Sequence, residues 1–445
     1  MRAAGGIPRG CAPAETPPRP RAALATLETA LVGVAVFLSP MNYFRLDAAY
    51  ATLSDAVACA ALLVMLLRRR VPREPFGPGT TLWLTGVLAL AAGLTLGSLA
   101  HGGMDALVVI LAQYLFSLVI LPFVLAGRPY RETIALLKVL IASIVAVMAF
   151  GAWVVHFVPE PDIRLVSWSG RMRSLVEREN ECAALGAIAI VLLLNLALLR
   201  EVRPLAVVLG LPILLYGVAL TGSNTGLLMT VFGVSATVLF NGSARAIGIF
   251  AACTAAGVAA ILAAGDLFLP EVFRERVLSA LLDGNIAQAG SFEGRLHLMQ
   301  EAAEIARHTL LLGLGADQFR VVSSHGAPVH NTYLLLLAEG GLLSLAGLVM
   351  LLLTGVFLGW AALAGGRTRR QGMVTLVLLV IFAMMLNTFA HFYARFWNVP
   401  LILALALSSS CLARDPAGPA GAARPGGARH DGARQGGTRP PEEGS

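Results

Sequence analysis

The run TYLLLLAEGGLLSLAGLVMLLLTGVFLGWAAL occupies residues 332–363, and Glu339 is the only charged residue in it. A helix needs about 20 predominantly apolar residues to cross a hydrocarbon core of about 30 Å. The run exceeds that length, and it does not alternate between polar and apolar positions as a membrane β-strand would. It therefore predicts a membrane-spanning helix.

Similar apolar runs recur along most of the chain. The whole sequence is 57% hydrophobic and only 13% charged, with a mean hydropathy of +0.76, whereas about 25% of the residues of a soluble domain are charged. We predict an all-α, polytopic membrane helix bundle of about 12 transmembrane helices. The predicted spans are 24–40, 51–67, 80–99, 106–126, 134–158, 181–199, 204–220, 224–240, 245–265, 332–363, 372–390 and 396–412.

Arginines gather in alternate connections between these spans, a distribution typical of cytoplasmic loops. They are Arg68, Arg69, Arg70, Arg73, Arg128, Arg131, Arg200, Arg203, Arg245, Arg367, Arg369 and Arg370. This bias predicts that both termini are cytoplasmic. Residues 1–21 and 413–445 are rich in Pro, Gly, Ala and Arg, so we predict that both tails are disordered. The first span has no small-residue cleavage site after it and is predicted to remain as an anchor.

This topology divides the chain into a few parts. Residues 22–265 form a membrane domain of nine helices, 266–331 a large outer loop containing short amphipathic helices, and 332–412 the last three helices. A medium loop at 159–180 is predicted on the same outer face. Polar residues are concentrated in these two loops, so we expect the chemistry of the protein there.

The medium loop carries Arg171, Arg173 and Arg178 just before a predicted span. These arginines are candidates for binding an anion, because a guanidinium group is always charged and can bridge two phosphate oxygens. Lipid headgroups, or the neighbouring carboxylates of Glu177 and Glu179, are alternative partners for them.

In the large loop, Arg295 precedes a helical pattern of apolar residues. Leu296, Met299, Ala303 and Ala306 recur at spacings of three or four residues, which predicts an amphipathic helix lying near the membrane surface. Taken alone, Arg295 is typical of a solvated residue at the start of a helix.

The large loop ends at His330, next to the run quoted first. Asn331 is a plausible N-cap of the last long helix, and free N–H groups of its first turn would then lie beside His330, where an anion is favoured. Taken alone, His330 is typical of a satisfied residue at a helix start. Glu293 and Glu339 are further acidic candidates, and Glu339 lies about two turns into the helix.

Several other site types find no support in the sequence. His297, His308, His325 and His330 match no common metal-ligand spacing, so we predict no metal site and no cofactor. Gly313 and Gly315 form too short a motif for nucleotide binding and are expected to make a turn. The net charge of +7 is explained by the loops and tails, so no nucleic-acid partner is expected.

A group of short motifs resembles the bacterial O-antigen ligase and O-antigen polymerase superfamily. The motifs are Gly294-Arg295 before a helix, Leu312-Gly313-Leu314-Gly315, His330-Asn331 followed by Gly341-Leu342-Leu343, the arginine-bearing loop that ends in Asn180, and Thr221-Gly222-Ser223-Asn224-Thr225-Gly226. The number of spans and the position of the large loop fit as well, so the resemblance covers most of residues 24–412.

The resemblance implies a metal-independent glycosyltransferase of the bacterial inner membrane. Such enzymes move a glycan from a polyprenyl diphosphate to an acceptor sugar, which is a glycan or is linked to a lipid, on the periplasmic face. By the same resemblance, Arg295 engages the diphosphate and His330 belongs to the reaction centre. Asn224 departs from the family, which commonly has an arginine at this position.

These residue types suit the transfer of a sugar. Negative charge builds on the departing phosphate, so fixed cations aimed at it lower the barrier. The attacking hydroxyl must lose its proton, and a histidine near neutrality accepts it. We therefore predict His330 and Arg295 as catalytic residues. The predicted substrate contacts are Arg171, Arg173, Arg178, Asn224, Asn331 and Glu339.

Two alternatives remain open at this stage. A polymerase of the same superfamily would use similar contacts to the donor and differ only in its acceptor. A polysaccharide flippase or transporter would carry out no covalent chemistry, but such proteins usually show related halves and charged groups deep in the bundle. We see no internal repeat, and the charges lie mainly at the ends of the spans.

Overall fold

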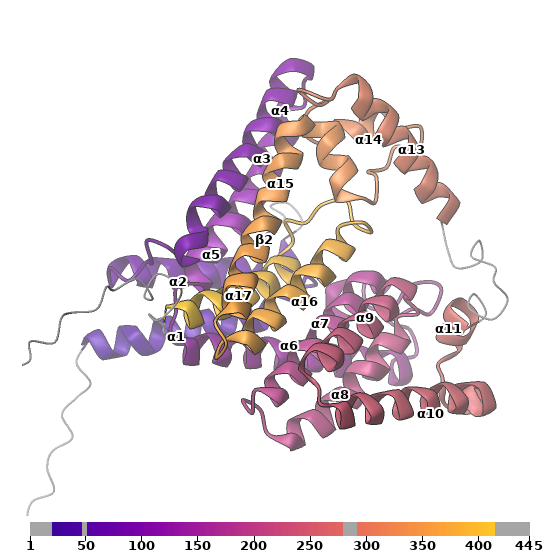
Figure 1. The fold of residues 1–445 in the computed structure, drawn as a ribbon. Coiled ribbons are helices and arrows are strands. Elements are labelled where there is room, and N and C mark those ends of the chain that lie inside the picture. Colours follow the sequence, from indigo (N-terminus) through magenta and orange to yellow (C-terminus); the bar gives the residue numbers. More distant parts are fainter. Residues whose placement is uncertain (1–19, 47–50, 279–291, 414–445) are drawn as a thin grey trace, which may run out of the picture.

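In the computed structural model, the described residues are 20–46, 51–278 and 292–413. Nearly all of both predicted tails, and part of the large loop, lie outside them. The described chain is about 76% helical with nearly no sheet (Figure 1), which confirms the all-α prediction. The sheet found among these residues is small: β1 (Arg45–Leu46) pairs antiparallel with β2 (Ala51–Thr52).

The helices follow the predicted spans closely. In chain order the long helices are α1 (Pro20–Leu38), α2 (Leu53–Leu67), α3 (Thr80–His101), α4 (Met104–Leu115), α6 (Tyr130–Phe157), α7 (Glu179–Leu198), α8 (Pro204–Leu220), α9 (Asn224–Asn241), α10 (Ala244–Phe268), α13 (Phe292–His308), α15 (Thr332–Ala364), α16 (Arg369–Met385) and α17 (Arg395–Leu412). The short elements are η1 (Gly77–Gly79), η2 (Phe116–Ile120), α5 (Leu121–Leu125), η3 (Ser174–Val176), α11 (Glu271–Phe273), η4 (Arg274–Leu278) and α14 (Gln318–Val322).

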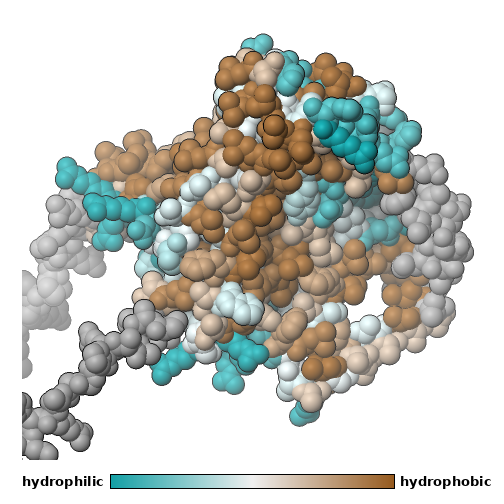
Figure 2. Space-filling view, turned by 45° about the horizontal axis from the view of Figure 1, so that its top comes forward, coloured by the Kyte–Doolittle hydropathy of each residue, from teal (hydrophilic) through white to brown (hydrophobic). Residues whose placement is uncertain are grey.

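Seven of the described helical segments are long and apolar enough to cross a membrane, and four shorter helices are also apolar. Apolar side chains cover much of the face shown in Figure 2, and hydrophilic ones gather toward its edges. Large apolar residues such as Leu88 and Val208 are 68% and 66% exposed. Such a surface suits a lipid environment, so the fold indicates a multi-pass membrane protein. The total of about 12 spans and the side on which each loop lies remain predictions.

Helices α3 and α15 run side by side (Figure 1) and approach each other very closely. A Cβ added at Gly93 would lie 2.4 Å from the Gly340 carbonyl oxygen, and one added at Gly347 would lie 2.4 Å from the Leu90 nitrogen. The Ser344 hydroxyl donates to the Leu90 carbonyl at 2.8 Å. Small residues permit this approach, which is a common way to join helices within a membrane.

Helix α15 is not the continuous helix that the sequence predicted. Gly341 lies inside it with φ 65° and ψ −166°, which kinks the helix. The turn at residues 310–315 bonds to the kink: the Leu314 and Gly315 N–H groups donate to the carbonyls of Ala338 and Glu339, both at 2.8 Å. Gly341 is required here because its positive φ is costly for other residues. The predicted turn at Leu312–Gly315 is confirmed.

Most of the arginine-bearing connections are joined to one another at one end of the bundle. Glu28 forms ion pairs with Arg68 and, at 3.3 Å, with Arg128. Farther along, Arg370 donates to the Leu198 carbonyl at 2.8 Å. These contacts group the loops that the sequence assigned to the cytoplasm; the side of the membrane that they face stays a prediction.

Loops predicted on the outer face also meet. The Tyr43 N–H donates to the Leu175 carbonyl at 2.9 Å, and the Met172 N–H donates to the Leu220 carbonyl at 3.0 Å. Glu177 accepts from Asn42 at 2.8 Å. The medium loop is therefore bonded both to the chain after α1 and to the turn between α8 and α9.

Helix α13 is amphipathic as predicted, but the predicted apolar face was partly wrong. Its buried residues are Leu298, Ala302 and Ala306, whereas Leu296 is 43% exposed. The buried face packs on α14 and on the first part of α15, so neighbouring helices determine which residues are covered. The helix also begins at Phe292 and includes Arg295 in its first turn, rather than following that residue.

Aromatic residues at the start of α17 and just before it lie in the core and not at the surface. Phe392 and Trp397 are each 2% exposed and lie in the core. Arg395 is buried, and it donates to Asp55 at 2.5 Å and to Gln113 at 2.6 Å. Its guanidinium is therefore used in a buried ion pair.

Candidate functional site

Arg171 joins three segments that lie apart in the sequence. Its Nε donates to the Thr221 carbonyl at 2.7 Å, and its terminal nitrogen donates to Asn180 Oδ1 at 3.0 Å. The Ser223 hydroxyl donates to the same Asn180 oxygen at 2.9 Å. The medium loop, the start of α7 and the turn before α9 are thus held together around one guanidinium group.

Other arginines lie close to Arg171. Burial lowers the pKa of the Arg171 guanidinium to about 10, and the positive charges of Arg276, Arg173 and Arg295 contribute to this lowering. Like charges destabilise one another when they are brought together. This positive cluster, which also includes the exposed Arg178, therefore favours a bound anion.

Arg295 is partly buried and forms no ion pair within the described part of the chain. Its Nε is buried without a hydrogen-bond partner, and no carboxylate of the described residues forms an ion pair with it. It lies in the first turn of α13, and a buried polar atom without a hydrogen-bond partner is costly. Its guanidinium is therefore available to an anionic ligand.

His330 lies in the field of this cluster, directly before α15. Burial lowers the pKa of the half-buried imidazole, and the charges of Arg295 and Arg178 lower it further. The ring is therefore neutral near pH 7 and is able to accept a proton. The structure thus brings together His330 and Arg295, which the sequence predicted as a pair.

Arg173 and Arg178 are partly neutralised by acidic neighbours. Arg173 forms an ion pair with Glu179 at 3.0 Å, and Arg178 forms one with Glu181 at 3.7 Å. The Arg178 side chain is 66% exposed, so it lies at the rim of the cluster. Both predicted residues belong to the cluster, but each has an acidic partner, whereas Arg295 has none among the described residues.

Sequence reasoning missed Arg276, which lies in η4 after α11. The Asn224 side chain donates to the Arg276 carbonyl at 3.3 Å, and the Arg276 charge reaches Arg171. The available signal was the charged stretch Arg274-Glu275-Arg276 after the ninth predicted span. Residue 224 has no charge of its own, and its side chain contacts the backbone of a neighbouring arginine.

The two predicted asparagines have roles in the fold. Ser223, rather than Asn224, is the N-cap of α9, since its hydroxyl accepts from the Gly226 N–H at 3.2 Å. Asn331 is the N-cap of α15, as predicted, and its Oδ1 accepts from the Leu334 N–H at 3.0 Å.

The first turn of α15 is already occupied by protein groups. Besides the cap, the Thr332 N–H donates to the Leu386 carbonyl at 2.8 Å. These two N–H groups are therefore not open to a ligand. An anion near this helix start would therefore be bound by the arginine side chains and not by these backbone N–H groups.

Glu339 does not lie with the arginine cluster. It is 2% exposed, and its Oε1 accepts from the Phe319 N–H at 3.3 Å. Its surroundings are the kink of α15 and α14, where Arg320 pairs with Asp317 at 2.6 Å. Its predicted contact with a substrate is not favoured by this position.

His391 is a second histidine near the cluster that the sequence did not single out. Burial lowers its pKa to about 4, and the charges of Arg178 and Arg320 add to this, while Asp317 opposes it. Arg178 thus influences both His391 and His330. The signal in the sequence was a histidine between two predicted spans, hidden in an aromatic run.

The acids and histidines in the described part of the chain do not form a metal centre. There, no group of three or more His, Cys, Asp and Glu side chains is arranged to hold a metal ion. The cluster instead combines fixed positive charge with a neutral imidazole. Chemically, this arrangement can bind a phosphate group and accept a proton beside it.

The chain was also compared with known proteins. Residues 205–352, from α8 into α15, match the O-antigen ligase family. The match supports the O-antigen ligase and polymerase superfamily. It includes Arg276, Arg295 and His330, while the loop of Arg171 lies before it. No curated protein matches the chain.

The superfamily recognised in the sequence is thereby confirmed. Its members are enzymes of the glycosyltransferase type that act on lipid-linked glycans. An O-antigen ligase or polymerase type of function is supported for this multi-pass membrane protein.

Proposed function

We propose that the protein transfers a glycan from a polyprenyl diphosphate to an acceptor sugar at the periplasmic end of the bundle, as an O-antigen ligase does. The observation that supports this most is Arg295, a partly buried arginine whose Nε has no hydrogen-bond partner, near His330, whose pKa is lowered by burial and by the charge of Arg295. A diphosphate supplies the negative charge that the cluster lacks.

The reaction follows from these two groups. The acceptor hydroxyl attacks the anomeric carbon of the donor glycan, and its proton passes to the His330 imidazole. The bond from that carbon to the diphosphate oxygen breaks, and the electron pair leaves with the polyprenyl diphosphate. Arg295 and Arg171 stabilise the charge that grows on that oxygen, so the proposal assigns no step to a metal ion or cofactor.

The test uses cells that lack the gene and carry plasmid-borne variants. We expect Arg295→Gln to lower glycan transfer about 10²–10³-fold and His330→Ala to lower it about 10²–10⁴-fold. The measurement is the amount of glycan on extracted acceptor and carrier lipids, together with the amount of protein in the membrane.

Two matched controls lie on the same helix as Arg295. Arg307 and His308 are exposed, and each forms an ion pair with Glu304. We expect Arg307→Gln and His308→Ala to transfer glycan normally. Full activity in both Arg295→Gln and His330→Ala would overturn the proposal.

The same extracts separate the ligase from the polymerase. Loss of a ligase leaves full-length chains on the carrier, whereas loss of a polymerase leaves a single repeat on the acceptor. The donor contacts proposed above serve either enzyme, because only the acceptor differs.

A further inference from the structure

A second recess lies far from the arginine cluster, between α6 and the first half of α8. Its volume is about 520 Å³, which falls within the range of about 300–1,000 Å³ for small-molecule sites. The recess starts near Arg203, directly before α8. The arginine cluster instead forms hydrogen bonds with the turn after Leu220, at the other end of this helix. At about 1.5 Å per residue, the 17 residues of α8 separate the Arg203 end of the recess from the cluster by about 25 Å, and the apolar walls reach along α8 as far as Ile213.

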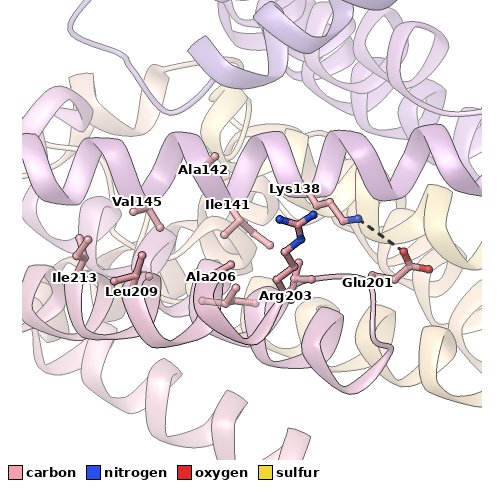
Figure 3. A pocket seen from close by; sticks show the side chains of 12 residues that line it. Lys138, Ile141, Ala142, Val145, Glu201, Arg203, Ala206, Leu209 and Ile213 are labelled. Carbon is pink, nitrogen blue, oxygen red and sulfur yellow. Dashed lines mark ion pairs between the residues drawn. The ribbon is translucent and has the colours of Figure 1, made fainter.

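The long part of this groove is apolar. Figure 3 shows Ile141 and Val145 on α6 facing Leu209 and Ile213 on α8 across it. Leu209 is 59% exposed, so the groove opens to the surroundings of the bundle. In a membrane those surroundings are lipid, and an apolar channel of this kind matches a hydrocarbon chain.

One end of the groove is charged. Lys138 approaches Glu201 at 3.8 Å, and both side chains are only partly exposed, at 42% and 31%. Arg203 extends from α8 toward α6 at the same end (Figure 3), and no carboxylate of the described chain forms an ion pair with it. Two cations against one carboxylate leave a net positive charge at this end.

The charged end of the groove lies at the end of the helix bundle where the arginine-bearing loops meet. Tyr130, in the first turn of α6, donates to Glu201 at 3.3 Å, and the sequence predicts that these loops face the cytoplasm. That leaflet carries anionic lipids, and basic pockets between membrane helices on this side bind their headgroups.

We propose that this groove binds an anionic phospholipid. One acyl chain lies along the apolar walls, and the phosphate contacts Arg203 and Lys138. A zwitterionic lipid places a cation beside the same residues and forfeits this attraction. A water-soluble anion gains no binding free energy from the apolar walls. The apolar walls and the positively charged end together therefore favour a lipid.

The first test measures lipid binding to the purified full-length protein in detergent. Phosphatidylglycerol is titrated against phosphatidylcholine with the same acyl chains, and bound lipid is counted by native mass spectrometry. We expect phosphatidylglycerol to bind more tightly, and each of Lys138→Gln and Arg203→Gln to weaken it about fivefold.

The control for charge is Arg245→Gln. Arg245 is an exposed arginine at the start of α10 and does not line the groove. We expect it to bind phosphatidylglycerol as the wild type does. Equal binding of the two lipids, or equal effects of Arg203→Gln and Arg245→Gln, would overturn the proposal.

The second test fills the groove without changing its charge. Ala206 lines the groove, whereas the neighbouring Leu205 does not. We expect Ala206→Phe to weaken phosphatidylglycerol binding and Leu205→Phe to leave it unchanged. Unchanged binding in Ala206→Phe would show that the apolar walls hold no chain.

A third measurement uses the fact that Lys138 is the only lysine of the chain. An amine-reactive reagent therefore labels one side chain, which peptide mapping separates from the N-terminus. We expect phosphatidylglycerol to slow labelling of Lys138 and phosphatidylcholine to leave it unaffected. None of these measurements depends on glycan transfer, so they stand apart from the proposed function.

Discussion

Arg395 and Arg295 show how differently the same side chain is used in this molecule. Arg395 is 7% exposed and is matched by Asp55 and Gln113, at 2.5 and 2.6 Å. Arg295 has a buried Nε without a hydrogen-bond partner and lies near other arginines. The first arrangement holds helices together, whereas the second leaves positive charge uncompensated. A carboxylate partner therefore marks an arginine that stabilises the fold, and we propose that the arginine without one binds a ligand.

The sharpest test of this comparison is to remove each charge in turn. Arg395→Gln leaves Asp55 buried without its cation, and we expect a loss of about 3–5 kcal/mol in the free energy of unfolding. Arg295→Gln breaks no ion pair among the described residues and should unfold as the wild type does. The measurement is unfolding of the detergent-solubilised variants. Equal destabilisation of both would remove the distinction.

Arg171 lies between these two cases, because it both bonds to the fold and contributes charge. Arg171→Lys keeps the charge but cannot reach both the Thr221 carbonyl and Asn180. We expect the free energy of unfolding to fall by about 1–3 kcal/mol. Arg173→Lys is the control: its partly exposed ion pair with Glu179 contributes less than about 1 kcal/mol. A larger effect of Arg173→Lys would reverse the assignment.

The pH dependence of transfer tests whether the cluster acts on His330. The imidazole accepts a proton only when neutral, so activity is lost as the pH falls through the pKa of His330. That pKa lies below its ordinary value of 6.5 because of burial and the charges of Arg295 and Arg178. Arg178→Gln removes one of these charges, raises the pKa, and should move the acidic limb to higher pH. Arg307→Gln should leave the limb unmoved; an unmoved limb in Arg178→Gln would contradict the proposed field.

The smallest effect is expected at Glu339, which lies outside the cluster. Glu339→Gln keeps an oxygen that accepts from the Phe319 N–H, so we expect glycan transfer to stay within about twofold and stability within about 0.5 kcal/mol. Both are measured as for the other variants. A loss as large as that of Arg295→Gln would return Glu339 to the reaction centre, as the sequence first suggested.

The sequence singled out most residues of the proposed site because they lie beside recognisable local signals. His330 and the cap Asn331 stand at the junction of a polar loop and an apolar run. Arg295 lies at the start of an amphipathic pattern. Arg276 carried no such signal, and only its position beside Asn224 and Arg171 in space identifies it.

What the sequence did not predict about Leu296 and about the surroundings of Glu339 has a common physical cause. Leu296 and Leu298 are both apolar and close in the sequence, and only the packing of α13 on α15 buries the second. Glu339 is about two turns from Asn331 along the helix, but the kink at Gly341 places it against the 310–315 turn. Distance along a helix does not determine which neighbours cover each face.

The sequence alone determined the helical membrane architecture, the ends of most helices and the residue types of the site. Hydropathy, caps and turn residues act within a few positions of the chain, so they can be read locally. Only the tertiary structure decided which arginines have a carboxylate partner. Ion pairing depends on groups from distant segments, such as Asp55 and Arg395, and on the low dielectric that packing creates around them.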